Sequence, residues 1–211
     1  MKYSLVYLIL ILFGFGIVSK TTLSYRERKK QLDGKITLVT ELKENLGLQV
    51  DDGKNSIESL KKDVEESYRA GSRVQMEKAL GIAEGEVHFL QRKLCSPMEE
   101  IAGNLYQKAM GDWILLDTED KSSSKKLDWD TKEKIQRYLS MAKSEKDHAK
   151  DYFLSGNFHR SLHTYKKSIV YSLLSLRSQK SEIPDEFKTA DQIWVEPILL
   201  GNKKTSTIQE N

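Results

Sequence analysis

The sequence predicts an all-α protein, because apolar residues recur at helical spacing in three stretches of the chain. They repeat every seven residues over 25–46, and at steps of three and four residues over 57–68. Residues 149–176 form two amphipathic segments on either side of a short turn that contains glycine. We therefore expect an N-terminal apolar helix, then a long helix or short coiled coil, then antiparallel helical hairpins.

Residues 3–18 are apolar, carry no charge and directly follow Lys2. This order is typical of a secretion signal or a membrane anchor. As a helix, roughly 16 residues span about 24 Å, slightly less than the ~30 Å hydrocarbon core of a bilayer. Residues 1–19 are therefore predicted to be a signal peptide or membrane anchor, which makes the body either exported and periplasm-like or membrane-associated.

A basic run at residues 26–30 follows the apolar segment and bears on the orientation of the body. By the positive-inside rule, these charges favour an anchor whose body faces the cytoplasm. The short N-terminal tail and the order of the segments favour export instead. We expect export, with the cytoplasm-facing anchor as the alternative, and we interpret the basic run as a contact with anionic lipid headgroups.

Residues 20–54 are predicted to form a membrane-proximal helix or coiled coil. The seven-residue stripe suits a two-chain coiled coil, but Lys29 and Lys43 lie on its second seam and Gly34 falls inside the run. Packing of the same stripe against the chain's own helices is an equally good interpretation.

Residues 55–119 are predicted to be a helical region. Asn55 with Glu58 is typical of a helix start, and Gly71 indicates an interruption. Ser96 followed by Pro97 predicts the start of a further helix, because serine can cap a helix and proline fits its first turn.

The last third of the chain divides into a linker, a hairpin and a docking segment. Residues 120–130 are polar, small and charged, which predicts the linker. A helical hairpin is expected over 131–180. Residues 181–211 contain two prolines and an apolar cluster at 193–200, so we expect this segment to dock on the helical body before it ends in a polar tail.

The hairpin combines small residues at the helix contact, glycine at the turn and aromatic residues for the space between the helices. The residues that carry this pattern are Ala149, Tyr152, Gly156, Phe158, Ser161, Tyr165 and Ser168. Their spacing resembles one tetratricopeptide (TPR) repeat, a helix-turn-helix unit. Glu145, His148 and Leu173 stand where the family prefers Trp, Leu and Pro. The resemblance implies a TPR-like hairpin that holds a protein partner, although any close antiparallel helix pair would share part of this pattern.

The polar side of the second hairpin helix offers a recognition surface, made of His159, Arg160, His163 and Lys166. We expect this strip to bind another protein of unknown identity. The protein would then be a non-enzymatic adaptor, for example in an envelope or appendage assembly, that also contacts a membrane through residues 3–18 if these are retained.

A metal site is the alternative interpretation of the same region. His159 and His163 lie one helical turn apart, a spacing that can present two imidazoles to one metal, and His148 could supply a third ligand. However, Arg160 stands where metalloproteases carry their glutamate. The alternative function is therefore a small extracytoplasmic metal-binding protein or enzyme.

Other chemistry has little support in the sequence. No Gly-rich phosphate loop, serine-nucleophile motif or paired-carboxylate signature is recognisable, so we expect no catalytic residue and no cofactor. The 34 Lys plus Arg nearly balance the 31 Asp plus Glu, which argues against nucleic-acid binding. The single cysteine, Cys95, is expected to be buried. Trp113, Trp129 and Trp194 are either core residues or anchors for a partner.

Overall fold

The computed structural model describes residues 24–49, 56–122 and 127–200, and the regular elements in these ranges are helices. The longer ones are α2 (Tyr25–Asn45), α3 (Ile57–Arg69), α4 (Arg73–Ser122), α5 (Trp129–Leu154) and α6 (Phe158–Gln179). The predicted all-α fold is confirmed. The predicted apolar segment at 1–19 lies outside the described residues. Within the described ranges, no helix has the length and apolar character needed to span a bilayer.

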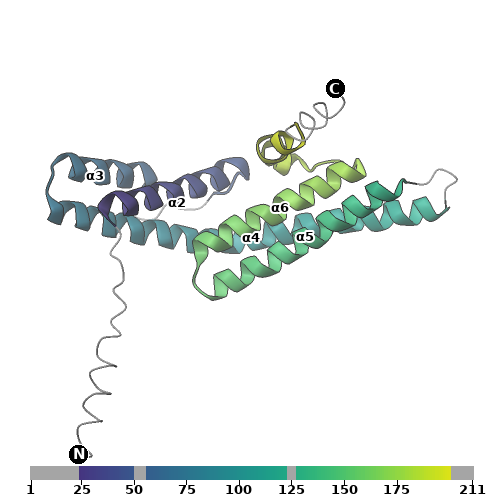
Figure 1. The fold of residues 1–211 in the computed structure, drawn as a ribbon, viewed down its shortest axis with the longest axis horizontal. Helices are drawn as coiled ribbons and strands as arrows, with labels where there is room; N and C mark the ends of the chain where they lie inside the picture. Colours follow the sequence, from purple (N-terminus) through teal and green to yellow (C-terminus); the bar gives the residue numbers. More distant parts are fainter. Residues whose placement is uncertain (1–23, 50–55, 123–126, 201–211) are drawn as a thin grey trace, which may run out of the picture.

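The long helix α4 is the spine of the molecule (Figure 1). α2 and α3 pack along its N-terminal part, whereas α5 and α6 pack along its middle and C-terminal part. α6 contacts α4, α5 and α2. The molecule is therefore elongated, with two helical bundles that share one helix.

The prediction of a helix start at Ser96 is wrong, because α4 continues through Pro97. A proline in a helix interior removes a backbone hydrogen bond and costs about 3 kcal/mol or more. The neighbouring residues Leu94, Cys95 and Met98 are each at most 1% exposed. Their burial in the core offsets this cost, so tertiary packing overrides the local signal.

The seven-residue stripe of α2 is buried against the chain's own helices rather than left accessible to a second chain. Its buried residues include Leu32, Ile36, Val39 and Leu42. Near the start of α2, Arg28 forms ion pairs with Glu77 and Glu84 of α4 at 2.5 and 2.8 Å. Of the two interpretations of this stripe, packing within the chain is therefore the one that describes the structure.

Glycines in the left-handed region form two of the turns between helices. Gly71 has a φ of +69° and lies between α3 and α4, and Gly156 has a φ of +77° and lies between α5 and α6. Residues with a Cβ are strained at these angles. After the second turn, the Asn157 side chain caps α6 by accepting a hydrogen bond from the Arg160 backbone amide at 3.3 Å.

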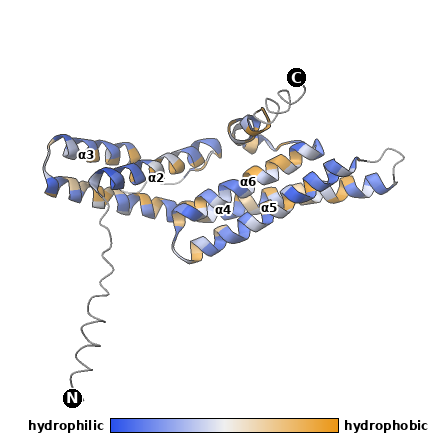
Figure 2. Ribbon diagram, viewed as in Figure 1, coloured by the Kyte–Doolittle hydropathy of each residue, from blue (hydrophilic) through white to orange (hydrophobic). Residues whose placement is uncertain are grey.

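Small residues allow α5 and α6 to approach each other closely. Ser161 Oγ donates to the backbone oxygen of Ala149 at 2.8 Å, and Ser168 Oγ donates to that of Ala142 at 2.7 Å. All four residues are fully buried. Each serine thus satisfies its hydroxyl inside the helix contact. Figure 2 shows hydrophilic and hydrophobic positions mixed along each helix, as expected of amphipathic helices.

The connection between α4 and α5 is shorter than the linker expected at 120–130. α4 extends to Ser122, and α5 begins at Trp129 with Asp128 as its cap. Asp120 is buried and forms an ion pair with Lys132 of α5 at 2.5 Å. This pair joins the last turn of α4 to the start of α5.

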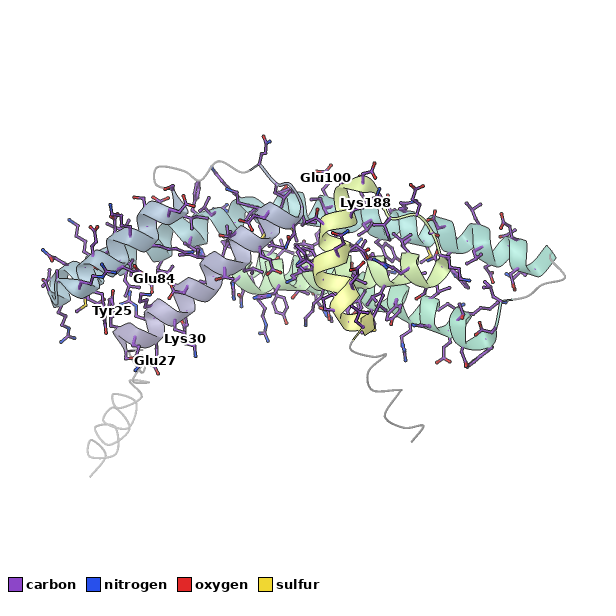
Figure 3. All side chains as sticks on the ribbon, turned by 90° about the horizontal axis from the view of Figure 1, so that it is seen from above. Tyr25, Glu27, Lys30, Glu84, Glu100 and Lys188 are labelled. Atoms are coloured by element: carbon purple, nitrogen blue, oxygen red, sulfur yellow. The ribbon has the colours of Figure 1, made fainter. Side chains whose placement is uncertain are left out.

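The segment after α6 folds back across it (Figure 3). It contains three short helices, η1 (Asp185–Phe187), α7 (Lys188–Ala190) and η2 (Asp191–Val195). Phe187, Trp194 and Val195 are buried. Arg177 of α6 forms ion pairs with Asp191 and, at 3.2 Å, with Glu196. These contacts hold the segment over α6, beside the C-terminal end of α2.

Candidate partner-binding groove

A groove of about 670 Å³ lies where α2, α5, α6 and the C-terminal segment meet. Its volume falls within the range of about 300–1,000 Å³ that is typical of ligand sites. Apolar and aromatic side chains predominate in its lining, together with two lysines, one histidine and one glutamate. The lining residues are Glu41, Tyr138, His163, Lys166, Lys167, Val170, Tyr171, Leu174, Ile193, Trp194 and Ile198.

One side of the groove is fixed by the Glu41 carboxylate, which joins three elements. Lys166 of α6 lies 2.5 Å from Glu41 Oε1, and Trp194 Nε1 donates to the same oxygen at 2.7 Å. The Lys166 ammonium also lies 4.8 Å from the centre of the Trp194 ring. A charge-assisted hydrogen bond and a cation–π contact therefore act on the same three side chains.

The remainder of the lining is aromatic and aliphatic. The rings of Tyr138 and Tyr171 stack at 6.4 Å with an interplanar angle of 19°. Ile193 is 51% exposed and Ile198 is 44% exposed. Large apolar side chains that stay accessible around a concave surface are typical of sites that bind another molecule.

The four residues of the predicted recognition strip are separated by the structure. His163 and Lys166 line the groove, but Lys166 is already occupied by Glu41. Arg160 is exposed and lies 4.9 Å from the centre of the Tyr152 ring. His159 is half-buried against α4, with its Nδ1 3.1 Å from the side-chain nitrogen of Gln91. The strip is therefore not one continuous exposed surface.

Burial and nearby cations favour the neutral form of the two histidines of α6. Partial burial lowers the pKa of His159, and His163 and Lys35 lower it further. Partial burial also lowers the pKa of His163, and Lys166 adds to this effect. In this orientation the Gln91 amide nitrogen donates and Nδ1 of His159 accepts.

The residues of the alternative metal site are brought together only in part. The rings of His159 and His163 lie 4.7 Å apart in an edge-to-face arrangement. His148 is exposed on α5. Among the described residues, no group of three or more His, Cys, Asp or Glu side chains is placed to hold a metal ion.

The aromatic residues of the hairpin do not pack only between α5 and α6, because one of them also contacts α4. Phe158 contacts Phe153 of α5 at 5.7 Å between ring centres, and also His88 of α4 at 4.8 Å. Tyr165 is fully buried, and burial raises the pKa of its hydroxyl. Tyr152 is half-buried beneath Arg160. The hairpin is thus joined to α4 through its aromatic side chains.

The cysteine and the three tryptophans differ in how far they are buried. Cys95 is buried, with its Sγ 3.9 Å from the backbone oxygen of Phe158, and burial raises the pKa of its thiol to about 11. Trp113 and Trp194 are buried, whereas Trp129 is 72% exposed. Only Trp194 lines the groove.

Sequence reasoning missed Glu41, Tyr138 and Tyr171 as parts of the groove. Glu41 lies 125 residues before Lys166 and 153 residues before Trp194, so no local pattern connects them. A signal did exist for the C-terminal wall, because the apolar cluster at 193–200 indicated a docking segment.

Comparison of the chain with protein-family models, curated proteins and solved structures found no match.

Proposed function

We propose that the protein is a non-enzymatic helical adaptor, membrane-anchored or exported, that binds a segment of another protein in the groove over α6. The observation that carries this proposal is the groove itself, where exposed isoleucines and stacked tyrosines from separate elements surround a concave surface. Partner-binding sites combine an aromatic and aliphatic centre, which becomes buried when the partner binds, with a polar rim.

The lining favours a partner segment that carries an apolar side chain next to a carboxylate. The apolar side chain would pack on Tyr171 and Ile193. The carboxylate would meet Lys167, whose side chain is 61% exposed and only loosely paired, at 4.0 Å, with Glu145. Lys166 is less available because Glu41 holds it at 2.5 Å.

We further propose that the α5–α6 hairpin is a TPR-like unit within this adaptor. Support comes from the left-handed Gly156 at the turn and from the buried serines, Ser161 and Ser168, at the helix contact. In this proposal the hairpin presents α6 to the partner, and α4 supports it from behind.

Site-specific photocrosslinking in native membranes tests the groove. A photoreactive amino acid at Ile193, which is 51% exposed, should trap a discrete protein partner. The matched control is Ile114 of α4, which is 56% exposed and does not line the groove. The crosslinked partner peptide should contain an acidic residue beside an apolar one. Equal crosslinking from both positions, or none from Ile193, would contradict the proposal.

A charge reversal at the rim tests the chemistry of the partner. Lys167→Glu should lower the crosslinking yield from Ile193, most strongly at low salt, because rim charges act on the association rate. Lys150→Glu is the matched control, since Lys150 is 60% exposed and also has one carboxylate partner. A partner that is unaffected by Lys167→Glu does not use an acidic side chain in the groove.

Metal binding is the second candidate function, favoured only by the 4.7 Å separation of the His159 and His163 rings. Metal analysis of the purified protein tests it. Stoichiometric zinc that disappears in the His159→Ala/His163→Ala double variant would support this candidate over the adaptor.

A further inference from the structure

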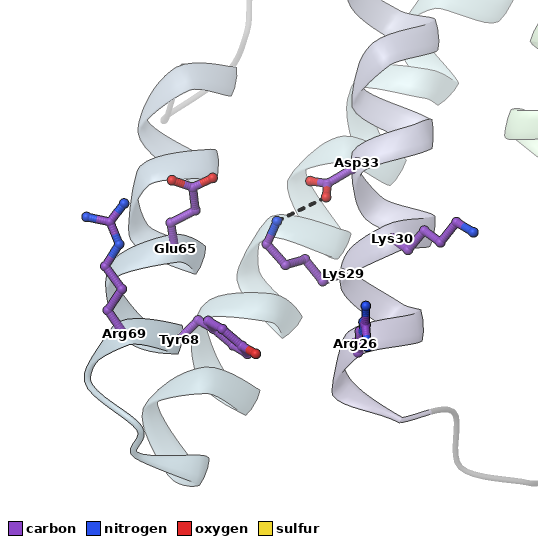
Figure 4. Close-up of a pocket in the computed structure, with 7 residues that line it drawn as sticks. All are labelled: Arg26, Lys29, Lys30, Asp33, Glu65, Tyr68 and Arg69. Atoms are coloured by element: carbon purple, nitrogen blue, oxygen red, sulfur yellow. Dashed lines mark hydrogen bonds and ion pairs between the residues drawn. The ribbon is translucent and has the colours of Figure 1, made fainter.

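A second groove, of about 490 Å³, lies between the start of α2 and the end of α3 (Figure 4). It is far from the groove over α6 and shares no residue with it. Four cations line it, against two carboxylates: Arg26, Lys29, Lys30 and Arg69 against Asp33 and Glu65. This leaves a local surplus of two positive charges in a protein whose net charge is only +3.

The excess positive charge around this groove is not neutralised by ion pairs within the described residues. Within the described residues, Lys29 pairs with Asp33 at 3.0 Å, whereas Arg26, Lys30 and Arg69 form no ion pair. Arg28, in the same basic run, differs because it faces α4 and pairs there with two glutamates. Arg28 is therefore structural, whereas Arg26, Lys30 and Arg69 remain without an ion-pair partner among the described residues.

An aromatic wall lies beside these cations. Tyr68 stacks on Tyr25 at 5.6 Å between ring centres and yet is 56% exposed. Figure 4 shows Tyr68 projecting from α3 toward α2, with Arg26 and Lys29 on the facing helix. Tyrosine with one face accessible, next to basic side chains, suits the boundary between lipid headgroups and water.

We propose that this groove binds the phosphate headgroup of an anionic phospholipid in the membrane that residues 3–18 enter. The inference rests on the membrane association in the proposed function. Arg26 follows Val18 by eight positions, which limits the distance between the two residues to about 28 Å even if the chain is fully extended. Arginine is suited to this ligand, because its planar guanidinium can donate two hydrogen bonds to one phosphate.

Native mass spectrometry of the full chain in a neutral detergent tests the groove. The protein is titrated with phosphatidylglycerol or with phosphatidylcholine of the same acyl chains. We expect the anionic lipid to bind at least fivefold more tightly, because each basic residue near an anionic surface contributes about fivefold. In the Arg26→Glu/Arg69→Glu variant, this preference should disappear.

The matched control is Lys78→Glu/Arg92→Glu, which changes the net charge equally at two exposed residues of α4 outside the groove. This variant should keep the preference. Equal binding of both lipids by the parent protein, or the same loss in both variants, would overturn the proposal. Circular dichroism of each variant verifies that the helices remain folded.

Two further experiments test whether the bound phosphate belongs to a lipid or to a soluble molecule, and whether the protein associates with a membrane at all. Glycerol phosphate at millimolar concentration should not displace the lipid; full displacement would identify a soluble phosphate ligand and overturn the lipid proposal. Flotation of the full chain with phosphatidylcholine vesicles tests membrane association alone. Flotation without a preference for the anionic lipid refutes only the groove, whereas failure to float refutes the membrane association as well.

Discussion

The two halves of α4 support different kinds of packing. Around the C-terminal half, α6 buries a nearly continuous face against α4 and α5, and two serines donate across the α5–α6 contact. Around the N-terminal half, α3 buries only three side chains, those of Ile57, Leu60 and Val64. The basic groove separates α3 from the start of α2.

The difference indicates which end is rigid. Dense packing around α6 provides a fixed platform for the groove that we propose as the partner site, since a site is most precise on elements whose side chains are locked by packing. The α2–α3 end has fewer buried contacts, so it can adjust more easily. Such an end suits contact with a lipid surface better than recognition of one partner shape.

Matched core truncations should show the largest difference between the two ends. Leu173 of α6 and Leu60 of α3 are 0% and 2% exposed. Leu173→Ala should destabilise by about 4 kcal/mol and Leu60→Ala by about 2 kcal/mol, because a cavity costs less where the surroundings can collapse. Urea unfolding followed by circular dichroism measures both. Equal losses would show that the two ends are equally rigid.

Matched substitutions at the two turns should change the free energy of unfolding by less than the core truncations. Gly156→Val and Gly71→Val both place a β-branched residue at a positive φ, which costs about 1–2 kcal/mol for the left-handed conformation alone. We expect the upper value for Gly156, because α5 and α6 are held together on both sides of the turn, and the lower for Gly71. Gly81→Ala, within α4, should instead stabilise by about 0.5–1 kcal/mol. A Gly156→Val protein as stable as its parent would remove the argument from turn geometry.

The sequence predicted the local features of both ends better than their packing. The helical spacing and the turn glycines, Gly71 and Gly156, each depend on a few adjacent residues. Ser96 and Pro97 gave a false helix start because the local signal carries no information about the burial of Leu94 and Met98. Lys166 was expected to face water, but its partner Glu41 belongs to a distant helix.

The candidate sites were accessible to sequence reasoning only where their residues are neighbours in the chain. The basic run at 26–30 was visible, and so was the apolar cluster at 193–200. The groove over α6 was not, because Glu41, Tyr138 and Trp194 converge only through the folding of three separate elements. Distance along the chain, rather than residue type, limited the prediction.

Substitutions at two matched ion pairs should change the free energy of unfolding by less than substitutions at the turns. Arg28 and Lys166 have side chains that are 25% and 23% exposed. Lys166→Gln should destabilise by about 1 kcal/mol, because it leaves Glu41 without its cation beside the buried Trp194. Arg28→Gln should cost about 0.5 kcal/mol, since its partners Glu77 and Glu84 can be hydrated.

Urea unfolding measures the two single variants, and a double-mutant cycle with Glu41→Gln isolates the contribution of the Lys166 pair. Additive effects in that cycle would show that Lys166 and Glu41 do not stabilise each other, and would weaken the assignment of a fixed wall to the groove.

Lowering the pH should destabilise the end of the molecule that contains α6, because His159 and His163 become protonated. Their lowered pKa values mean that the unfolded chain, with a histidine pKa of about 6.5, binds protons before the folded chain does. The stability that the neutral rings provide is therefore complete above about pH 6.5 and is lost as the pH falls through the lowered values. Lys35, Lys166 and Lys167 oppose protonation, and Glu41 favours that of His163.

The measurement is the melting temperature at pH 7.5 and pH 5.0 for the parent and for the His159→Gln/His163→Gln variant. The variant should lose less stability on acidification, because it removes both proton-binding rings. Hydrogen exchange should place the difference between the parent and the variant in α6 and the adjacent stretch of α4 near Gln91, since a protonated Nδ1 can no longer accept from the Gln91 amide nitrogen. Identical losses in both proteins would show that the histidines do not couple this end of the molecule to pH.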